Sequence, residues 1–293
     1  MSAPYCLPIS QLFNKEQSYN TEITTNISDI QAVIFDWAGT TYDFGSCAPI
    51  IAFQQLFESY QIPITSEEAR LPMGSEKRQH IRQLLAMERI QAQWQKIYNQ
   101  SSTEADITRL YHDFVPFQIE AIRSCAQSIP GLMRTYNFLH ENQYRVGSNT
   151  GYSREMIDAL LPIAKEEGFI TDSVVCATEV QKGRPYPHMS LKNVMELGIE
   201  NVNACVKVDD TTIGIEEGLN AGMWTVGVAI SGNEVGLSLK DWQALDEALQ
   251  QKMKEQAYQN LYNAGAHYVI DSISTLPGVL EDIKLRLARG ERP

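Results

Sequence analysis

Short apolar runs recur along most of the chain, and stretches with the spacing of amphipathic helices separate them. We predict strands at Ala32–Phe35, Tyr144–Ser148, Ser173–Cys176, Cys205–Val208, Trp224–Ala229 and His267–Ile270. One helical pattern has an apolar stripe that ends at Gly168 and consists of Met156, Ile157, Leu160, Leu161 and Ala164. Strands that alternate with helices of this length predict βαβ units and a parallel sheet.

The region from about Cys47 to Ser124 breaks this alternation, because its patterns predict helices only. Apolar residues recur there at helical spacing, with a proline near the start: Pro49, Ile50, Phe53, Phe57 and Tyr60. Thr65-Ser66-Glu67-Glu68 has capping-box spacing, and other helical patterns cover His80–Ile90, Ala105–Phe114 and Leu239–Tyr262. We therefore expect an α/β core at 29–46 and 125–293, an all-helical domain at 47–124, and an irregular N-terminal arm at 1–28.

Composition and charge narrow the functional classes. The 293 residues, 43% of them hydrophobic, are enough for one large domain or for a core with an insertion. The net charge of −12 disfavours nucleic-acid binding, and it requires local cations or a metal to attract an anionic ligand. The 5 cysteines lack metal-ligand spacing and predict reduced thiols in the cytoplasm. We expect no signal peptide and no membrane association, since no apolar run approaches the roughly 20 residues of a membrane span.

The first predicted strand ends in a carboxylate, Asp36, which Trp37-Ala38-Gly39-Thr40-Thr41 follows at once. Ligands of open α/β sheets bind at the carboxyl ends of the strands, so Asp36 is placed to act as a nucleophile or a metal ligand. The simpler alternative is that Asp36 caps the next helix and that Ala38 fills space. This segment alone leaves both interpretations open.

Three later segments carry polar groups suited to a phosphorylated ligand. Ser148-Asn149-Thr150-Gly151 presents hydroxyl and backbone N–H groups just before a predicted helix. Arg184 stands in a turn with two prolines, where a guanidinium can grip two phosphoryl oxygens in a fork. A further strand ends in Asp209 and Asp210, and carboxylates are the hard oxygen ligands that Mg²⁺ prefers. Taken singly, such groups also fit helix caps, turns and a surface arginine.

In this order, the four segments resemble the motifs of the haloacid dehalogenase superfamily, whose enzymes form an aspartyl-phosphate or a related ester. Most of its phosphatases carry a second aspartate, a general acid, at the position of Ala38. Alanine there, and arginine rather than lysine at Arg184, resembles the phosphonoacetaldehyde hydrolases, whose carbon leaving group needs charge delocalisation rather than proton donation to oxygen. The resemblance covers about Gln31 to Pro293. It implies an α/β fold: a Rossmann-like parallel-sheet core with an inserted all-helical cap domain.

The resemblance also implies the site residues and the reaction. Lys77, four residues after Met73, corresponds to a cap lysine that forms a Schiff base with the substrate aldehyde. The matched catalytic residues are Asp36, Lys77, His80 and Tyr152; the substrate-binding ones are Met73, Gly74, Thr150, Gly151 and Arg184; the Mg²⁺ ligands are Asp36, the Ala38 carbonyl and Asp210. The implied reaction is hydrolysis of the carbon–phosphorus bond of phosphonoacetaldehyde to acetaldehyde and phosphate, in 2-aminoethylphosphonate degradation. A homodimer is also implied, with an apolar stripe around Phe53 and Phe57 as a candidate contact.

Two points stay open in the sequence. The fourth motif usually has another acid four residues after the metal aspartate, but this chain has Gly214 there. The candidates to assist the metal instead are Asp209, Glu216 and Glu217. Lys77 lies among Glu, Arg and Gln, which is more typical of a solvated helix face, and Arg78 beside it is a candidate to lower its pKa.

Two rival functions fit parts of the sequence. A capped phosphatase or mutase acting on a small phosphate ester would leave Lys77 as a surface lysine, but the missing general acid at Ala38 argues against it. A non-enzymatic scaffold that binds a partner through acidic helices would have no need of Asp36, Arg184 and Asp210. Acetaldehyde release from phosphonoacetaldehyde, with and without Mg²⁺, separates these alternatives.

Overall fold

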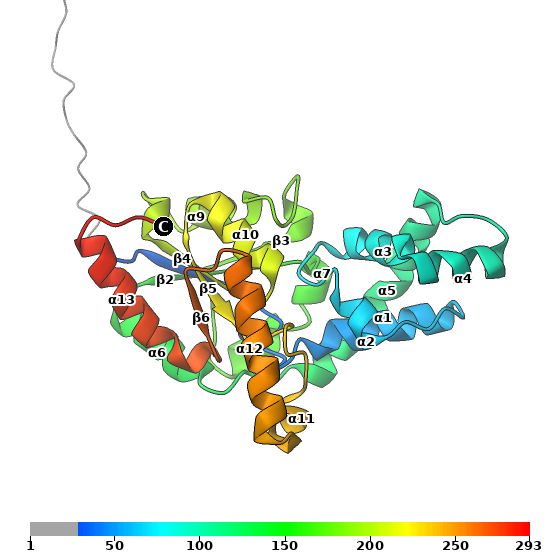
Figure 1. The fold of residues 1–293 in the computed structure, drawn as a ribbon. Helices are drawn as coiled ribbons and strands as arrows, with labels where there is room; N and C mark the ends of the chain where they lie inside the picture. Colours follow the sequence, from blue (N-terminus) through cyan, green and yellow to red (C-terminus); the bar gives the residue numbers. More distant parts are fainter. Residues whose placement is uncertain (1–28) are drawn as a thin grey trace, which may run out of the picture.

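A computed structural model of the protein describes residues 29–293, so the predicted N-terminal arm lies outside the described residues. Its centre is a 6-stranded sheet in the order β3-β2-β1-β4-β5-β6, and each neighbouring pair is parallel (Figure 1). The strands are β1 (Ala32–Phe35), β2 (Arg145–Thr150), β3 (Ser173–Cys176), β4 (Cys205–Asp209), β5 (Trp224–Val228) and β6 (Tyr268–Ile270). All the predicted strands are confirmed; β1 and β3 have the predicted bounds, and β2 continues past the prediction to Thr150.

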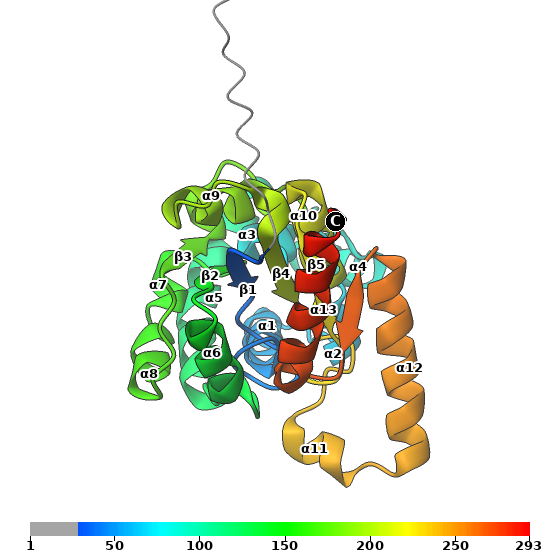
Figure 2. The same cartoon turned by 90° about the vertical axis from the view of Figure 1, so that its left-hand side faces the viewer.

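Helices cover both faces of the sheet, which explains why its strands are continuous apolar runs. Along β1, Val33 and Phe35 join one hydrophobic cluster, while Ala32 and Ile34 join another on the opposite face. The first face packs against α6 (Leu132–Glu141) and α13 (Leu276–Ala288), and the second against α9 (His188–Glu196) and α10 (Thr212–Ala221) (Figure 2). The predicted parallel-sheet α/β core is therefore confirmed.

The segment from Cys47 to Cys125, called the helical block below, contains helices and lies to one side of the sheet (Figure 1). Its helices are α1 (Cys47–Ser59), α2 (Ser66–Arg70), α3 (Lys77–Ala86), α4 (Glu88–Tyr98) and α5 (Glu104–Cys125). The capping box at the start of α2 is confirmed, because Thr65 and Glu68 each accept a hydrogen bond from the other's backbone N–H. Phe53 and Phe57 are fully buried inside the chain, so the apolar stripe expected to favour a dimer is already covered.

Three of the predicted helical patterns, each expected to form one continuous helix, are interrupted in the structure. The stripe that ends at Gly168 forms two short helices, α7 (Arg154–Ile157) and α8 (Leu161–Glu166). Pro162, in the first turn of α8, has no N–H to continue α7 and starts a new helix instead. The pattern over His80–Ile90 breaks at Met87, whose backbone is extended, with φ −67° and ψ 131°.

The late acidic stretch is likewise divided, into α11 (Leu239–Ala244) and α12 (Glu247–Asn263), and Asp246 caps the second helix. Short 3-10 turns complete the secondary structure at Ala177–Glu179, Val202–Ala204 and Ile273–Thr275. Within residues 29–293, no helix combines the length and apolar character that crossing a membrane requires. The cysteines of this region, Cys47, Cys125, Cys176 and Cys205, are free thiols.

Candidate active site

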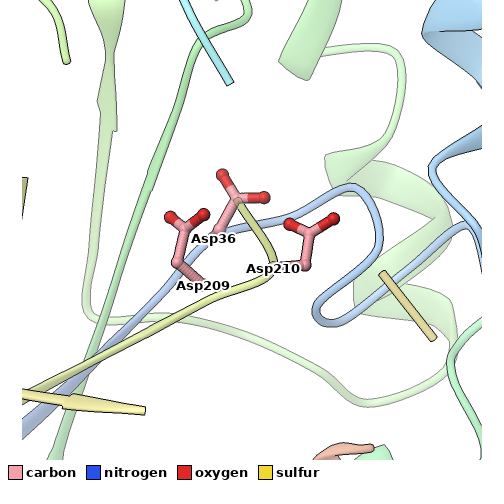
Figure 3. A group of neighbouring side chains, drawn as sticks. All are labelled: Asp36, Asp209 and Asp210. Atoms are coloured by element: carbon pink, nitrogen blue, oxygen red, sulfur yellow. The ribbon is translucent and has the colours of Figure 1, made fainter. Parts of the chain in front are cut away.

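Three buried carboxylates meet at the carboxyl end of the sheet (Figure 3). Asp36 follows β1, while Asp209 ends β4 and Asp210 follows it. Strand order reverses beside β1, between β2 on one side and β4 on the other, and this is where open α/β sheets bind ligands. Ligand oxygens of the three side chains lie within 4.8 Å of one another, a spacing that one metal ion can span.

Arg184 ties these strand ends together. Its Nη2 donates to Asp36 Oδ1 at 2.6 Å and to Asn149 Oδ1 at 2.8 Å. The same nitrogen lies 3.1 Å from Asp209 Oδ2, and Nε donates to Glu217 Oε2 at 2.9 Å. The turn predicted from Pro185 and Pro187 holds the arginine, with a cis Arg184–Pro185 bond, and α9 begins at His188.

A second buried cation, Lys207, stands behind this group. It lies in the middle of β4 and is completely inaccessible to solvent. Its Nζ donates to Asn149 Oδ1 at 2.8 Å and lies 3.0 Å from Asp209 Oδ2. Buried charges are tolerated when they are paired and hydrogen-bonded. Lys207 and Arg184 therefore supply the positive charge that lets several carboxylates share the site.

The three carboxylates differ in proton affinity. Burial raises the pKa of Asp36 above its usual value, although the Arg184 guanidinium opposes that effect. Burial and the neighbouring charges of Asp36 and Asp209 hold the pKa of Asp210 well above its usual range. Burial also acts to raise the pKa of Asp209, but Arg184 and Lys207 outweigh it and hold that pKa below its usual value.

The residues around the carboxylates fit a divalent cation. Asp210 is held by Thr40 Oγ1, which donates to its Oδ1 at 3.2 Å, and by the Asn233 N–H, which donates to Oδ2 at 2.7 Å. Asp209 Oδ2 is buried and has no hydrogen-bond donor aligned with it among the described residues. Oxygen donors fixed in this way suit a hard cation. The three carboxylates therefore form a candidate metal site.

A cavity of about 20 Å³ lies above Asp36, between the sheet and the helical block. Most of the predicted site residues line it: Asp36, Ala38, Met73, Gly74, Lys77, Thr150, Gly151, Tyr152 and Arg184. Residues from the core and from the helical block therefore face the same space. The cavity is just large enough for about one water molecule.

Lys77 is buried rather than solvated. Its side chain stands at the first position of α3, and the residue is only 3% exposed. Its Nζ lies 5.2 Å from the Tyr152 ring centre and 5.7 Å from that of Phe53. Burial lowers the pKa of Lys77 to about 8, with Arg184 adding to the effect and Asp36 opposing it. The alternative of a solvated lysine is therefore excluded, and the cation that helps burial to lower this pKa is Arg184 rather than Arg78.

His80 lies behind Lys77, one helical turn along α3. Its Nε2 is 2.9 Å from the Ala69 carbonyl oxygen, which can only accept, so Nε2 carries the proton. Nδ1 is then an acceptor, and it has no partner among residues 29–293. Burial, together with the charge of Lys77, holds the pKa of His80 well below its usual value, so the ring is neutral. Burial raises the pKa of Tyr152 far above its usual value, so its hydroxyl keeps its proton.

The sequence left several supporting residues unidentified. Glu217 was considered as a metal ligand, but its carboxylate accepts from Arg184, from Asn149 Nδ2 at 3.2 Å, and from the N–H and hydroxyl of Ser190 at 3.0 and 2.8 Å. Glu216 is exposed. A lysine inside the apolar run Cys205–Val208 was the available signal for the buried cation at Lys207. Ser46, Pro49 and Thr211 also line the cavity, and no motif indicated them.

Comparisons with known proteins agree with this geometry. A family model described as haloacid dehalogenase-like hydrolase matches residues 30–222. The chain is 58% identical to a phosphonoacetaldehyde hydrolase of Hahella chejuensis over 264 residues, which cover 90% of each chain. A phosphonoacetaldehyde hydrolase of Paraburkholderia phytofirmans is 46% identical, with 90% of this chain and 99% of that one covered.

A solved structure agrees as well. The crystal structure of a phosphonoacetaldehyde hydrolase-like protein from Oleispira antarctica superposes with a TM-score of 0.89 at 52% identity, covering 90% of this chain and 96% of that one. These matches cover nine tenths of the chain, so they extend across both the sheet and the helical block. The chain is a haloacid dehalogenase-like hydrolase and belongs to the phosphonoacetaldehyde hydrolase family.

Proposed function

We propose that the enzyme hydrolyses the carbon–phosphorus bond of phosphonoacetaldehyde, giving acetaldehyde and phosphate through a Schiff base on Lys77 and an aspartyl-phosphate on Asp36. The observation that carries the proposal is the shared cavity of these two side chains, one a buried lysine whose pKa is lowered to about 8. A phosphatase has no use for such an amine, whereas carbonyl condensation needs a neutral one at moderate pH.

Lys77 starts the reaction. Its neutral amine attacks the aldehyde carbon, water leaves, and a protonated imine forms. The imine is an electron sink, because the electron pair of the breaking carbon–phosphorus bond moves into an enamine instead of a bare carbanion. The enamine carbon then takes up a proton, and water hydrolyses the resulting imine to release acetaldehyde and free Lys77.

Asp36 receives the phosphoryl group. A carboxylate oxygen attacks phosphorus in line with the leaving carbon, and water later hydrolyses the aspartyl-phosphate to phosphate. Arg184, already anchored to Asn149 and Glu217, holds the phosphoryl oxygens together with Thr150 and the Gly151 backbone. When bound by Asp36, the Ala38 carbonyl and Asp210, Mg²⁺ would offset negative charge on those oxygens.

The remaining residues position the aldehyde end. Neutral His80 offers a free Nδ1 as a proton acceptor near Lys77, directly or through water. The Tyr152 hydroxyl stays protonated and can donate, while Met73 shields the breaking bond from solvent. Gly74 brings the backbone of the helical block close to Thr211, since a Cβ on Gly74 would lie 2.6 Å from Thr211 Oγ1.

We further propose that the helical block is the cap domain of the enzyme, with the core formed by 29–46 and 125–293. It closes the site from above and contributes Lys77. A homodimer stays a prediction from the family resemblance, since the stripe around Phe53 and Phe57 is buried within one chain. The cytoplasmic location stays a prediction from the cysteine content.

Reductive trapping tests the proposed function. Borohydride added with phosphonoacetaldehyde should inactivate the enzyme irreversibly and leave one covalent adduct, which peptide mapping places on Lys77. Lys77→Arg should abolish both the adduct and acetaldehyde release, because a guanidinium keeps the charge but does not condense with an aldehyde. Lys182→Arg is the matched control and should behave like wild type. Acetaldehyde release without any adduct would exclude the Schiff base, and phosphate release from sugar phosphates alone would favour the phosphatase.

A further inference from the structure

Gly214 has no room for a side chain, because the carboxylate of Asp209 fills the space where one would lie. A Cβ on Gly214 would come within 2.0 Å of Asp209 Cγ and Oδ1 and within 2.2 Å of Oδ2. Asp209 is the last residue of β4, and Gly214 lies in the first turn of α10. Both positions are buried. An acid at position 209 and an acid at position 214 therefore exclude each other in this site.

We propose that Asp209 supplies the third carboxylate of the metal site, from the place that a side chain at position 214 would otherwise occupy. The inference rests on the proposed Mg²⁺ dependence and assigns a ligand that the motifs left open. The motif has its second acid four residues beyond Asp210, on the following helix. This chain instead has glycine there and a carboxylate one residue before Asp210. The second acid of the site therefore comes from the end of a strand rather than from the helix.

The contacts of Asp209 leave one oxygen available. Oδ1 accepts from the Thr211 N–H at 3.0 Å and from the Thr211 hydroxyl at 2.8 Å. Oδ2 forms ion pairs with Lys207 Nζ at 3.0 Å and with Arg184 Nη2 at 3.1 Å, and no donor among residues 29–293 is well aligned with it. Each carboxylate oxygen has two lone pairs, so Oδ2 keeps acceptor capacity that a cation can use.

The spacing of the three carboxylates agrees with a shared ion. Mg²⁺ binds oxygen at about 2.1 Å, so two ligands on opposite sides of one ion stand about 4.2 Å apart. Oxygens of Asp36, Asp209 and Asp210 lie within 4.8 Å of one another, so small side-chain rotations would bring all three onto one ion. Two other acids were candidates for the third metal ligand. Glu216 is exposed, and the Glu217 carboxylate already accepts hydrogen bonds from Arg184, Asn149 and Ser190.

Asp209→Asn tests the assignment without changing side-chain shape. Mg²⁺ binding to the metal-free, substrate-free protein, measured by calorimetry, should weaken at least tenfold. Glu216→Gln, which removes the same charge from the exposed face of α10, is the matched control and should bind Mg²⁺ like wild type. Unchanged Mg²⁺ affinity in Asp209→Asn would overturn the inference but leave the proposed reaction intact. If inorganic phosphate binding weakened instead, the role of Asp209 would be to anchor Arg184. A wild-type protein that binds no Mg²⁺ would overturn both.

The exchange of positions can be reversed experimentally. Gly214→Asp alone should lose thermal stability and Mg²⁺ affinity, because the new side chain meets Asp209. Asp209→Gly alone should lose Mg²⁺ affinity. Asp209→Gly combined with Gly214→Asp should recover Mg²⁺ affinity to within several-fold of wild type, because the carboxylate returns to the same space from the helix. The melting temperature shows whether the double variant is folded. If it is folded and binds Mg²⁺ no better than Asp209→Gly, the proposal that a carboxylate at position 214 can replace Asp209 is overturned.

Discussion

Gly151 and Ser75 meet backbone to backbone across the gap between the core and the helical block. A Cβ on Gly151 would lie 2.6 Å from the Ser75 carbonyl oxygen and 3.0 Å from that of Gly74. Both segments lead directly to site residues, since Tyr152 follows Gly151 and Lys77 stands two residues after Ser75. The position of the lysine over Asp36 thus depends on a contact that only glycine permits.

Gly151→Ala should lower kcat by about a hundredfold, because a displacement near 1 Å between reacting groups has that effect. The melting temperature should change little, since the methyl group can be accommodated by movement of the helical block. Steady-state kinetics and thermal unfolding measure the two effects separately. Gly278→Ala is the control, because a Cβ at that position would have no heavy atom of the described residues within 4 Å, and it should keep wild-type kinetics. A fully active Gly151→Ala enzyme would show that the contact is dispensable.

The rate should depend on the protonation of Lys77. Only the neutral amine condenses with an aldehyde, and the pKa of this lysine is lowered to about 8. Below that pH, kcat/KM and the rate of borohydride inactivation should both rise about tenfold per pH unit, and both should level off above it. A profile for inactivation that stays flat from pH 6 to pH 9 would contradict the lowered pKa.

The lowered pKa also carries a stability cost. The pKa of Lys77 is lower in the folded chain than its ordinary value of 10.5, so between about pH 8 and 10.5 the unfolded state binds more protons and stability rises with pH. At pH 7 the full cost of burying the charge is present. Lys77→Met should therefore raise the free energy of unfolding at pH 7 by about 3 kcal/mol, following 1.36 kcal/mol per pKa unit.

Denaturant titration at several pH values measures this effect. The gain from Lys77→Met should shrink as the pH rises from 8 to 10.5. Lys252→Met, which changes an exposed lysine on α12, should show no such gain. Equal behaviour of the two variants would mean that burial of Lys77 costs nothing.

Arg70 also links the helical block to the core. Its Nη1 donates to the Gly45 carbonyl at 2.9 Å and to Asn233 Oδ1 at 3.2 Å, and its Nη2 donates to the Gly236 carbonyl at 2.6 Å. The Asn233 N–H in turn holds Asp210. A lysine cannot reproduce this fork.

Arg70→Lys should therefore reduce kcat/KM by about tenfold, as expected from the loss of roughly 1.4 kcal/mol of closing interactions. The comparison variant is Arg89→Lys, since Arg89 contacts Glu68 and Pro63 within the helical block and reaches no core residue through those bonds. Its kinetics should match wild type. Similar losses in both variants would point to general destabilisation of the helical block.

The sequence predicted those features that depend on local pattern. Each strand was found because a strand covered on both faces needs a continuous apolar run. The broken stripe between α7 and α8 was missed because the apolar spacing continues across Pro162, while the break depends on one absent N–H.

Long-range contacts explain the features that the sequence left unresolved. The burial of Lys77 depends on Tyr152 and Phe53, which come from other segments of the chain. The role of Glu217 depends on Arg184, and the fold alone brings that guanidinium to the carboxylate. Family resemblance assigned Lys77 to the site, whereas the polar neighbours in its own segment pointed to solvent.

The size of the cavity over Asp36 has a kinetic consequence. With room for about one water molecule, the cavity cannot admit phosphonoacetaldehyde, which has several non-hydrogen atoms. We therefore expect each turnover to begin and end with a separation of the helical block from the sheet. Binding is gated, and the association rate should fall in proportion to solvent viscosity wherever that opening is slower than the chemistry. In the proposed mechanism, the small volume of this cavity would limit the access of bulk water to the enamine and the aspartyl-phosphate.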